Sequence, residues 1–181
     1  APLGARTWFR VGGNAEWLYQ PADAQDLASI MQRLPPELPV TTLGACANVI
    51  IRDGGIEGLV IRLARGFTAI EVEEDALVVG SACLDATVAE QAAAAGLGGL
   101  EFLSGIPGSI GGAVRTYAGA EGCGIARGRG WAEILNREVH LLRVDNAERR
   151  VGQRRPGPPV RATRNRCTYR DTPAHPPDSA A

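Results

Sequence analysis

The apolar residues of the N-terminal half follow two periods, one typical of a helix and one typical of strands. The helical set stands at positions i, i+3, i+4 and i+7 and comprises Leu27, Ile30, Met31 and Leu34. This spacing places four side chains on one face of a helix, where they can be buried together. Asp23 precedes the set as an N-cap and Pro35 follows it, so we expect the helix to lie between these two residues.

Short apolar runs flank this helix and predict strands. They occupy residues 16–20, 40–43 and 59–63. Strands on both sides of a helix predict a β-α-β unit with a small parallel sheet. Beyond them the apolar period changes to two, and the runs 70–72 and 76–79 are separated by a short acidic turn. This second pattern predicts an antiparallel hairpin.

The pattern weakens along the second half of the chain. An alanine-rich stretch ending at Ala95 predicts a helix that Asp85 caps and Gly96 ends. Residues 138–144 and 148–151 are separated by a polar turn. These two runs predict a further hairpin.

The last part of the chain changes in composition. Residues 152–159 are rich in proline, and residues 172–181 show no apolar period. We therefore expect a first subdomain at 1–68, a second subdomain at 69–151, and a poorly ordered, divergent or truncated tail at 152–181.

Composition narrows the class of protein. Apolar residues make up 45% of the 181-residue chain, which is enough for a packed core. No run of about 18 or more apolar residues occurs, and the first residues lack the charged and apolar regions of a signal peptide. We therefore expect a cytoplasmic protein without a membrane contact.

The charged residues and cysteines exclude several kinds of site. All 19 basic residues are arginine, which excludes a phosphate-loop lysine, a Schiff base and a lysine general base. The four cysteines lie far apart, so we expect free thiols and no metal site. Residues 1–122 carry a net charge of −7 and residues 123–181 one of +6. The arginines of the basic part are scattered among few aromatics, so we expect no nucleic-acid partner.

Two glycine-rich stretches, 43–48 and 103–113, each lie beside an apolar run. Glycines let the backbone turn freely and leave main-chain N–H groups accessible to a ligand. The second stretch is expected to start a short helix with Ser109 as its N-cap, and the N–H groups at a helix N-terminus suit a phosphate. Each stretch alone is equally well explained as a tight connection. Neither has the GxGxxG spacing of a dinucleotide-binding unit.

Four blocks of residues stand in a fixed order along the chain. They are TWFRVGGNAE at 7–16, LGACAN at 43–48 with IRDGG at 51–55, GLEFLSGIPGSIGGA at 99–113, and AGA at 118–120. Together they resemble the UDP-N-acetylenolpyruvoylglucosamine reductase (MurB) family, and the resemblance covers about residues 5–122. The segment CTYRD at 167–171 is similar to the Tyr-Arg motif of that family.

The resemblance implies a fold, a cofactor and a reaction. The fold is α+β, of the FAD-binding PCMH type (vanillyl-alcohol-oxidase-like), with two α+β subdomains that hold the flavin. The cofactor is FAD, with NADPH as electron donor. The reaction is the reduction of UDP-N-acetylglucosamine enolpyruvate to UDP-N-acetylmuramate in peptidoglycan synthesis. A UDP-sugar is therefore the expected small-molecule partner, and the sequence leaves the protein partners unknown.

The resemblance also implies site residues. Twelve residues are expected to hold the diphosphate and ribityl chain of FAD: Gly44, Ala45, Cys46, Ala47, Asn48, Ile106, Pro107, Gly108, Ser109, Gly111, Gly112 and Ala113. Arg170 is expected to be the catalytic and substrate-binding residue at the substrate carboxylate, because a guanidinium binds a carboxylate well. Tyr169 is expected to bind substrate beside it.

The chain departs from the family pattern at several positions. Cys46 and Ala47 stand where the family favours a glycine and a phosphate-binding serine. Tyr117 replaces an asparagine, and Glu121 replaces a tyrosine. The general-acid serine or cysteine and the late glutamate of the family have no counterpart in this chain. We therefore expect a fragment or a degenerate copy with an incomplete active site.

Two other functions fit the same residues. A related PCMH-type flavin oxidoreductase would keep the fold and use another electron acceptor. A non-catalytic remnant would bind flavin or nucleotide without consuming NADPH. Turnover of NADPH with the enolpyruvyl UDP-sugar separates these alternatives from the reductase.

Overall fold

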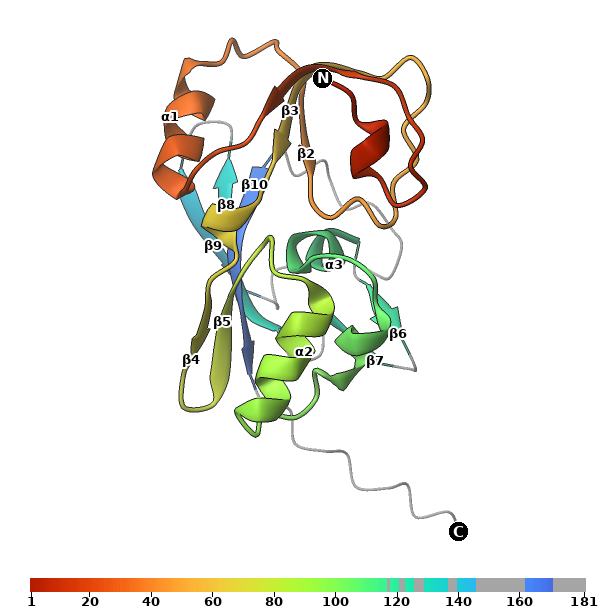
Figure 1. Cartoon of the computed structure of the whole chain (residues 1–181). Coiled ribbons are helices and arrows are strands. Elements are labelled where there is room, and N and C mark those ends of the chain that lie inside the picture. Colours follow the sequence, from red (N-terminus) through yellow and green to blue (C-terminus); the bar gives the residue numbers. More distant parts are fainter. Residues whose placement is uncertain (117, 121–122, 126–128, 137–139, 146–161, 171–181) are drawn as a thin grey trace.

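The computed structural model describes residues 1–116, 118–120, 123–125, 129–136, 140–145 and 162–170 (Figure 1). Its N-terminal part is a three-stranded sheet with the order β1-β3-β2. The strands are β1 (Ala15–Tyr19), β2 (Val40–Leu43) and β3 (Ile56–Arg62). Both β1 and β2 pair with β3 in parallel. The predicted small parallel sheet is therefore confirmed.

Helix α1 (Ala24–Arg33) lies between β1 and β2 in the chain and begins as the sequence predicts. The Asp23 carboxylate accepts a hydrogen bond from the Asp26 N–H at 2.8 Å, which satisfies one of the unpaired donors of the first turn. Leu27 and Met31 are buried and pack with residues of β3. Leu34 also packs against this cluster, although the helix ends one residue before it.

The second sheet is antiparallel throughout and has the order β4-β5-β10-β8-β9. Its strands are β4 (Ile70–Val72), β5 (Ala76–Gly80), β8 (Arg129–Asn136), β9 (Leu141–Asp145) and β10 (Ala162–Arg170). The predicted hairpin of β4 and β5 is confirmed.

One prediction for the C-terminal part needs correction, and another stays a prediction. The described partner of β9 is β8, and the predicted partner, residues 148–151, lies outside the described residues. Strand β10 occupies the centre of the sheet, so the prediction of a poorly ordered tail is wrong for residues 162–170. Its pairing partners β5 and β8 lie far away in the chain, and a pattern read along the sequence does not register such a pairing.

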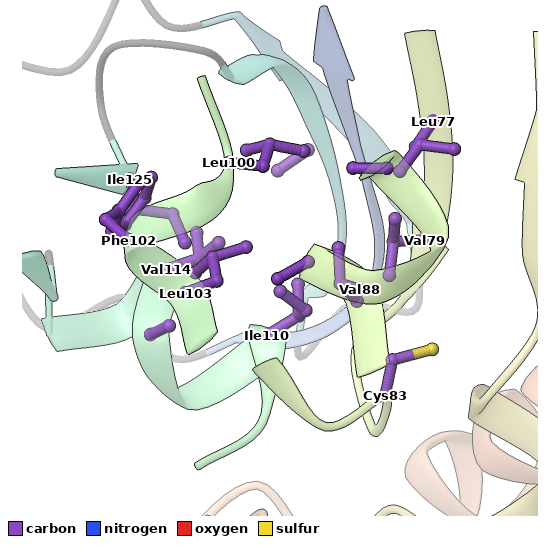
Figure 2. Packing of buried hydrophobic residues seen from close by; sticks show 14 residues of the cluster. Leu77, Val79, Cys83, Val88, Leu100, Phe102, Leu103, Ile110, Val114 and Ile125 are labelled. Carbon is purple, nitrogen blue, oxygen red and sulfur yellow. The ribbon is translucent and has the colours of Figure 1, made fainter. Parts of the chain in front are cut away.

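Three helical segments pack near this sheet: α2 (Asp85–Ala94), a 3-10 helix (Glu101–Gly105) and α3 (Ile110–Thr116). Their apolar side chains form one core cluster with β5 and β8 (Figure 2), which includes Leu77, Val88, Leu103, Ile110 and Ala132. Between α3 and β8 the chain also forms a short antiparallel pair of strands, β6 (Gly119–Ala120) and β7 (Cys123–Gly124).

The start of α2 differs from the sequence prediction. Leu84 holds the N-cap position, and Asp85 is the first helical residue, without a side-chain capping bond. Gly96 follows the C-terminal end of the helix at φ +73°, a conformation that favours glycine. The end of the predicted helix is thus confirmed, and the role of Asp85 as its cap is wrong.

The two sheets share part of their core. Leu135 of β8 packs in one cluster with Leu27, Met31 and Ile61 of the N-terminal part. A 3-10 helix (Arg65–Phe67) connects β3 to β4, and its Phe67 is buried in the same cluster. This shared cluster holds the loops after β2 and before α3 on a common framework.

Candidate functional site

A cavity of about 890 Å³ lies between the loop after β2 and the loop before α3. Residues 36–49 line one side, and residues 106–109 and 111–113 line the other. Ser81 and Asp85 also contribute to its wall. The volume is typical of sites for small molecules and cofactors.

All twelve residues that the sequence predicts to hold the cofactor line this one cavity. They come from two stretches about sixty residues apart in the chain, which the fold brings together. Ile110 lies within the second stretch and is not part of the cavity wall. Its side chain is fully buried in the core cluster, where it anchors the start of α3.

The two loops approach each other closely at Gly44 and Ser109. The Ala45 N–H donates a hydrogen bond to Ser109 Oγ at 3.3 Å. A Cβ at position 44 would lie 2.5 Å from the same oxygen, so the Ser109 side chain would have to move. Glycine at this position therefore permits the close approach of the two loops.

The start of α3 offers fewer N–H donors to a phosphate than the sequence suggests. The Ile110 N–H donates to the Cys83 carbonyl at 3.0 Å, and the Gly111 N–H donates to the Ser81 carbonyl at 2.8 Å. These two donors are used within the protein, and α3 has only seven residues. Gly112 differs from its neighbour because a Cβ there would meet only Ser109 Oγ, at 3.9 Å, and would extend into open space.

Cys46 occupies the most unusual backbone position of the first loop. Its φ is +56°, a left-handed conformation that non-glycine residues rarely adopt. The side chain is 5% exposed, and its thiol donates to the Gly44 carbonyl at 3.4 Å. Burial raises the pKa of the thiol, and the nearby Arg62 opposes this only in part. The thiol therefore stays protonated near neutral pH and is a poor nucleophile.

Asp85 is a residue of the cavity wall whose position sequence analysis missed. Its side chain is 1% exposed, and neither carboxylate oxygen has a hydrogen-bond partner among the described residues. Burial raises the pKa of this carboxyl to about 7. The Ser81 hydroxyl is also buried without a described partner. The place of Asp85 at the start of the predicted helix suggested a capping role. The sequence carries no signal that the Asp85 side chain is buried instead.

Residues 15–131 match the profile of a family described as FAD binding domain. This range covers more than half of the chain. The chain belongs to the FAD binding domain family.

Relatives of this FAD binding domain carry the name that the sequence blocks suggested. A UDP-N-acetylenolpyruvoylglucosamine reductase of Gluconobacter oxydans is 57% identical over 173 residues, which are 96% of this chain and 56% of the relative. The protein of that name in Acidiphilium cryptum is 60% identical over 142 residues, 78% of this chain and 46% of the relative. The chain thus spans about half the length of the curated relatives it matches.

Solved structures confirm the fold class of this FAD binding domain. The MurB reductase of Thermus caldophilus superposes with a TM-score of 0.81 at 28% identity, over 95% of this chain and 62% of that one. The 6-hydroxy-D-nicotine oxidase of Arthrobacter nicotinovorans has a TM-score of 0.67 at 14% identity, over 92% and 39%. At that identity the second likeness shows the fold alone. The predicted α+β flavin-binding fold is confirmed.

The predicted substrate residues lie at the end of β10. Tyr169 pairs with Leu77 and Arg170 with Ala76, at the first residues of β5. The cavity begins beyond the other end of β5, where Ser81 lines its wall. The side chains of Tyr169 and Arg170 lie outside the described part of the structure. The structure therefore brings together the two predicted cofactor loops, and the substrate role of Tyr169 and Arg170 stays a prediction.

Two absences concern the part of the chain that the structure describes. No group of three or more His, Cys, Asp or Glu side chains there is placed to hold a metal ion. No helix there has the length and apolar character needed to cross a membrane. Tyr117 and Glu121, two of the departures from the family pattern, lie outside the described residues.

Proposed function

We propose that this chain is the FAD-binding part of a UDP-N-acetylenolpyruvoylglucosamine reductase. The observation that carries the proposal is that the twelve predicted cofactor residues line one cavity of suitable size. Relatives of that name with 57% and 60% identity support it. Because the chain spans about half of each relative, the complete reaction is part of the proposal.

Two features of the cavity support a site for the diphosphate of FAD. Gly44 lets the two loops approach each other, and Gly112 leaves open space in the wall. Arg115 also lines the cavity and supplies a positive charge for an anionic ligand. We propose that residues 44–48 and 106–113 hold the diphosphate and the adjoining ribityl chain between them.

The chemistry divides between the cofactor and the protein. When bound, FAD supplies the transfer of hydride from NADPH to the enolpyruvyl double bond of the UDP-sugar. The loops of the cavity hold and orient the cofactor. We propose that Arg170 binds the substrate carboxylate through its guanidinium, with Tyr169 beside it. A cytoplasmic location goes with this proposal because NADPH and UDP-sugars are cytoplasmic metabolites.

The proposed domain organisation follows the two sheets. We propose a first subdomain at 1–68 and a second at 69–151, with β10 added to the second. The cavity then lies between the loops of the two subdomains, an arrangement that is common for cofactor sites.

Titration with FAD tests the binding step directly. The purified chain is expected to quench flavin fluorescence and to retain FAD through gel filtration, whereas riboflavin, which lacks the diphosphate, binds more weakly. A chain that changes neither the absorbance nor the fluorescence of FAD contradicts the proposal.

The full reaction needs a second experiment on a protein as long as the curated relatives. NADPH oxidation is expected only in the presence of the enolpyruvyl UDP-sugar. NADPH oxidation with another acceptor indicates a different flavin oxidoreductase, and FAD binding without any turnover indicates a non-catalytic protein.

A further inference from the structure

The side chain of Asp85 is deeply buried and has no hydrogen-bond partner among the described residues. Its side chain is 1% exposed, and both carboxylate oxygens are without a hydrogen bond within the described residues. A buried polar group without a hydrogen-bond partner destabilises the folded protein, and an unpaired buried charge does so more strongly. A buried carboxylate in a cavity wall therefore needs an explanation in terms of what the cavity binds.

The side chain is held directly against the glycine loop. The Asp85 N–H donates to the Gly108 carbonyl at 3.2 Å, and Leu84 forms a β-bridge with Ser109. A Cβ at position 108 would lie 2.9 Å from Asp85 Oδ2. A side chain at position 108 would therefore require the Asp85 carboxyl group to move.

The surroundings of Asp85 favour the neutral carboxylic acid over the carboxylate. Burial raises its pKa to about 7. On the described elements around it, the titratable or charged groups are Cys83 before it, Glu90 on α2, Glu101 on the 3-10 helix that packs against α2, Arg115 on α3, and Glu37 and Cys46 across the cavity. None of them contributes to the raised pKa, for which burial is the cause.

We propose that Asp85 is a further ligand-binding residue, which in its protonated form donates a hydrogen bond to an oxygen of the bound diphosphate. The inference rests on the proposed function, because it needs a diphosphate at the Gly108 loop. A carboxylate at this position would repel the diphosphate, whereas a carboxylic acid adds a donor to the loop. No residue-level resemblance to the reductases assigns this role to Asp85.

The proposal couples ligand binding to proton uptake. The anionic diphosphate raises the pKa of Asp85 further, because a like charge disfavours the carboxylate. The affinity for FAD is then fully present below about pH 7 and falls as the pH rises above it, by up to tenfold per pH unit. The diphosphate diester of FAD does not titrate near neutral pH, so it contributes nothing to this slope.

Calorimetric titration with FAD in buffers of different ionisation enthalpy measures the coupling. The wild-type chain is expected to take up about half a proton per FAD near pH 7. Asp85→Asn keeps a donor and is always neutral, so it is expected to take up no proton and to bind FAD with an affinity independent of pH. Asp85→Ala loses the donor and is expected to bind about tenfold more weakly than wild type at about pH 6.

The outcomes separate this inference from the proposed function. If wild type binds no FAD at any pH, the proposed function fails. If wild type binds FAD without proton uptake, or if Asp85→Asn keeps the wild-type pH slope, only the role of Asp85 is overturned. The wild-type measurement decides by itself should a variant fail to fold, and circular dichroism of each variant checks that it does fold.

Discussion

Cys46 illustrates how a single residue can be favoured and disfavoured by its position. Its φ of +56° costs an L-amino acid about 1–2 kcal/mol relative to glycine. Burial of the side chain with Leu43 and Ile51 offsets this cost by a similar amount. The loop therefore keeps a conformation suited to glycine with a cysteine in place.

Replacements at position 46 test this balance. We expect Cys46→Gly to be more stable than Cys46→Ala by about 1 kcal/mol, because alanine keeps the left-handed strain and loses most of the packing. Urea unfolding of the two variants measures the difference. At most other positions the alanine variant is more stable than the glycine variant. A Cys46→Ala variant that is more stable than Cys46→Gly would therefore contradict the backbone argument.

Two neighbouring glycines of α3 form a matched pair for separating fold from binding. A Cβ at Gly111 would lie 2.9 Å from the Ser81 carbonyl oxygen, whereas one at Gly112 would meet only Ser109 Oγ at 3.9 Å. We expect Gly111→Ala to lower the free energy of unfolding by about 1–3 kcal/mol.

The same substitution at Gly112 is expected to lower the affinity for FAD without lowering the stability. Gly112→Ala is expected to leave the stability unchanged or to raise it by up to about 1 kcal/mol, because alanine favours a helix. Its methyl group enters the cavity, so the affinity for FAD is expected to fall. Unfolding and FAD titration of both variants check the pair, and an unchanged FAD affinity in Gly112→Ala would place the ligand elsewhere.

At the scale of elements, the two long helices begin in different ways although both carry an aspartate at the predicted start. Asp23 precedes α1 and accepts a bond from the Asp26 N–H. Asp85 is already inside α2, and its side chain turns into the protein. Both residues are aspartates at the start of a predicted helix. Only the surrounding fold makes Asp23 a capping residue and Asp85 a buried acid.

The capping role of Asp23 leads to a direct prediction. We expect Asp23→Ala to lower the free energy of unfolding by about 1 kcal/mol, because the first turn of α1 loses a hydrogen-bond acceptor. Asp23→Asn keeps an acceptor and is expected to change stability by less than half as much. Glu90→Ala on the exposed face of α2 serves as a second control, and an equal loss there would argue against capping.

At the scale of the whole molecule, the cavity depends on contacts between distant parts of the chain. Its walls come from the loop after β2 of the parallel sheet and from the loop before α3, a helix that packs against the antiparallel sheet. The shared cluster around Leu135 holds these sheets together. A ligand in the cavity contacts both loops and therefore stabilises the folded arrangement of both parts.

This arrangement predicts a thermal shift. At an FAD concentration about 100 times the dissociation constant, we expect the chain to gain about 2.7 kcal/mol. For a protein of this size that corresponds to a rise in Tm of about 5–10 °C. Differential scanning calorimetry with FAD, and with riboflavin as control, measures it. An equal rise with riboflavin would show that the diphosphate contributes nothing.

Local patterns determined much of the N-terminal half from the sequence alone. The α1 stripe, its Asp23 cap, the parallel strands and the β4-β5 hairpin depend on residues close together in the chain, whose periods and turns act locally. The glycine motifs identified the two loops and the family, because glycine is required wherever backbones approach closely.

Only the tertiary structure decided which distant segments meet. The place of β10 between β5 and β8 and the meeting of Gly44 with Ser109 both join segments that are dozens of residues apart. Asp85 shows the same limit at a single side chain, since its burial against Gly108 depends on how α2 packs. Burial and long-range pairing are properties of the assembled core, and a sequence pattern records only the local preferences from which that core is selected.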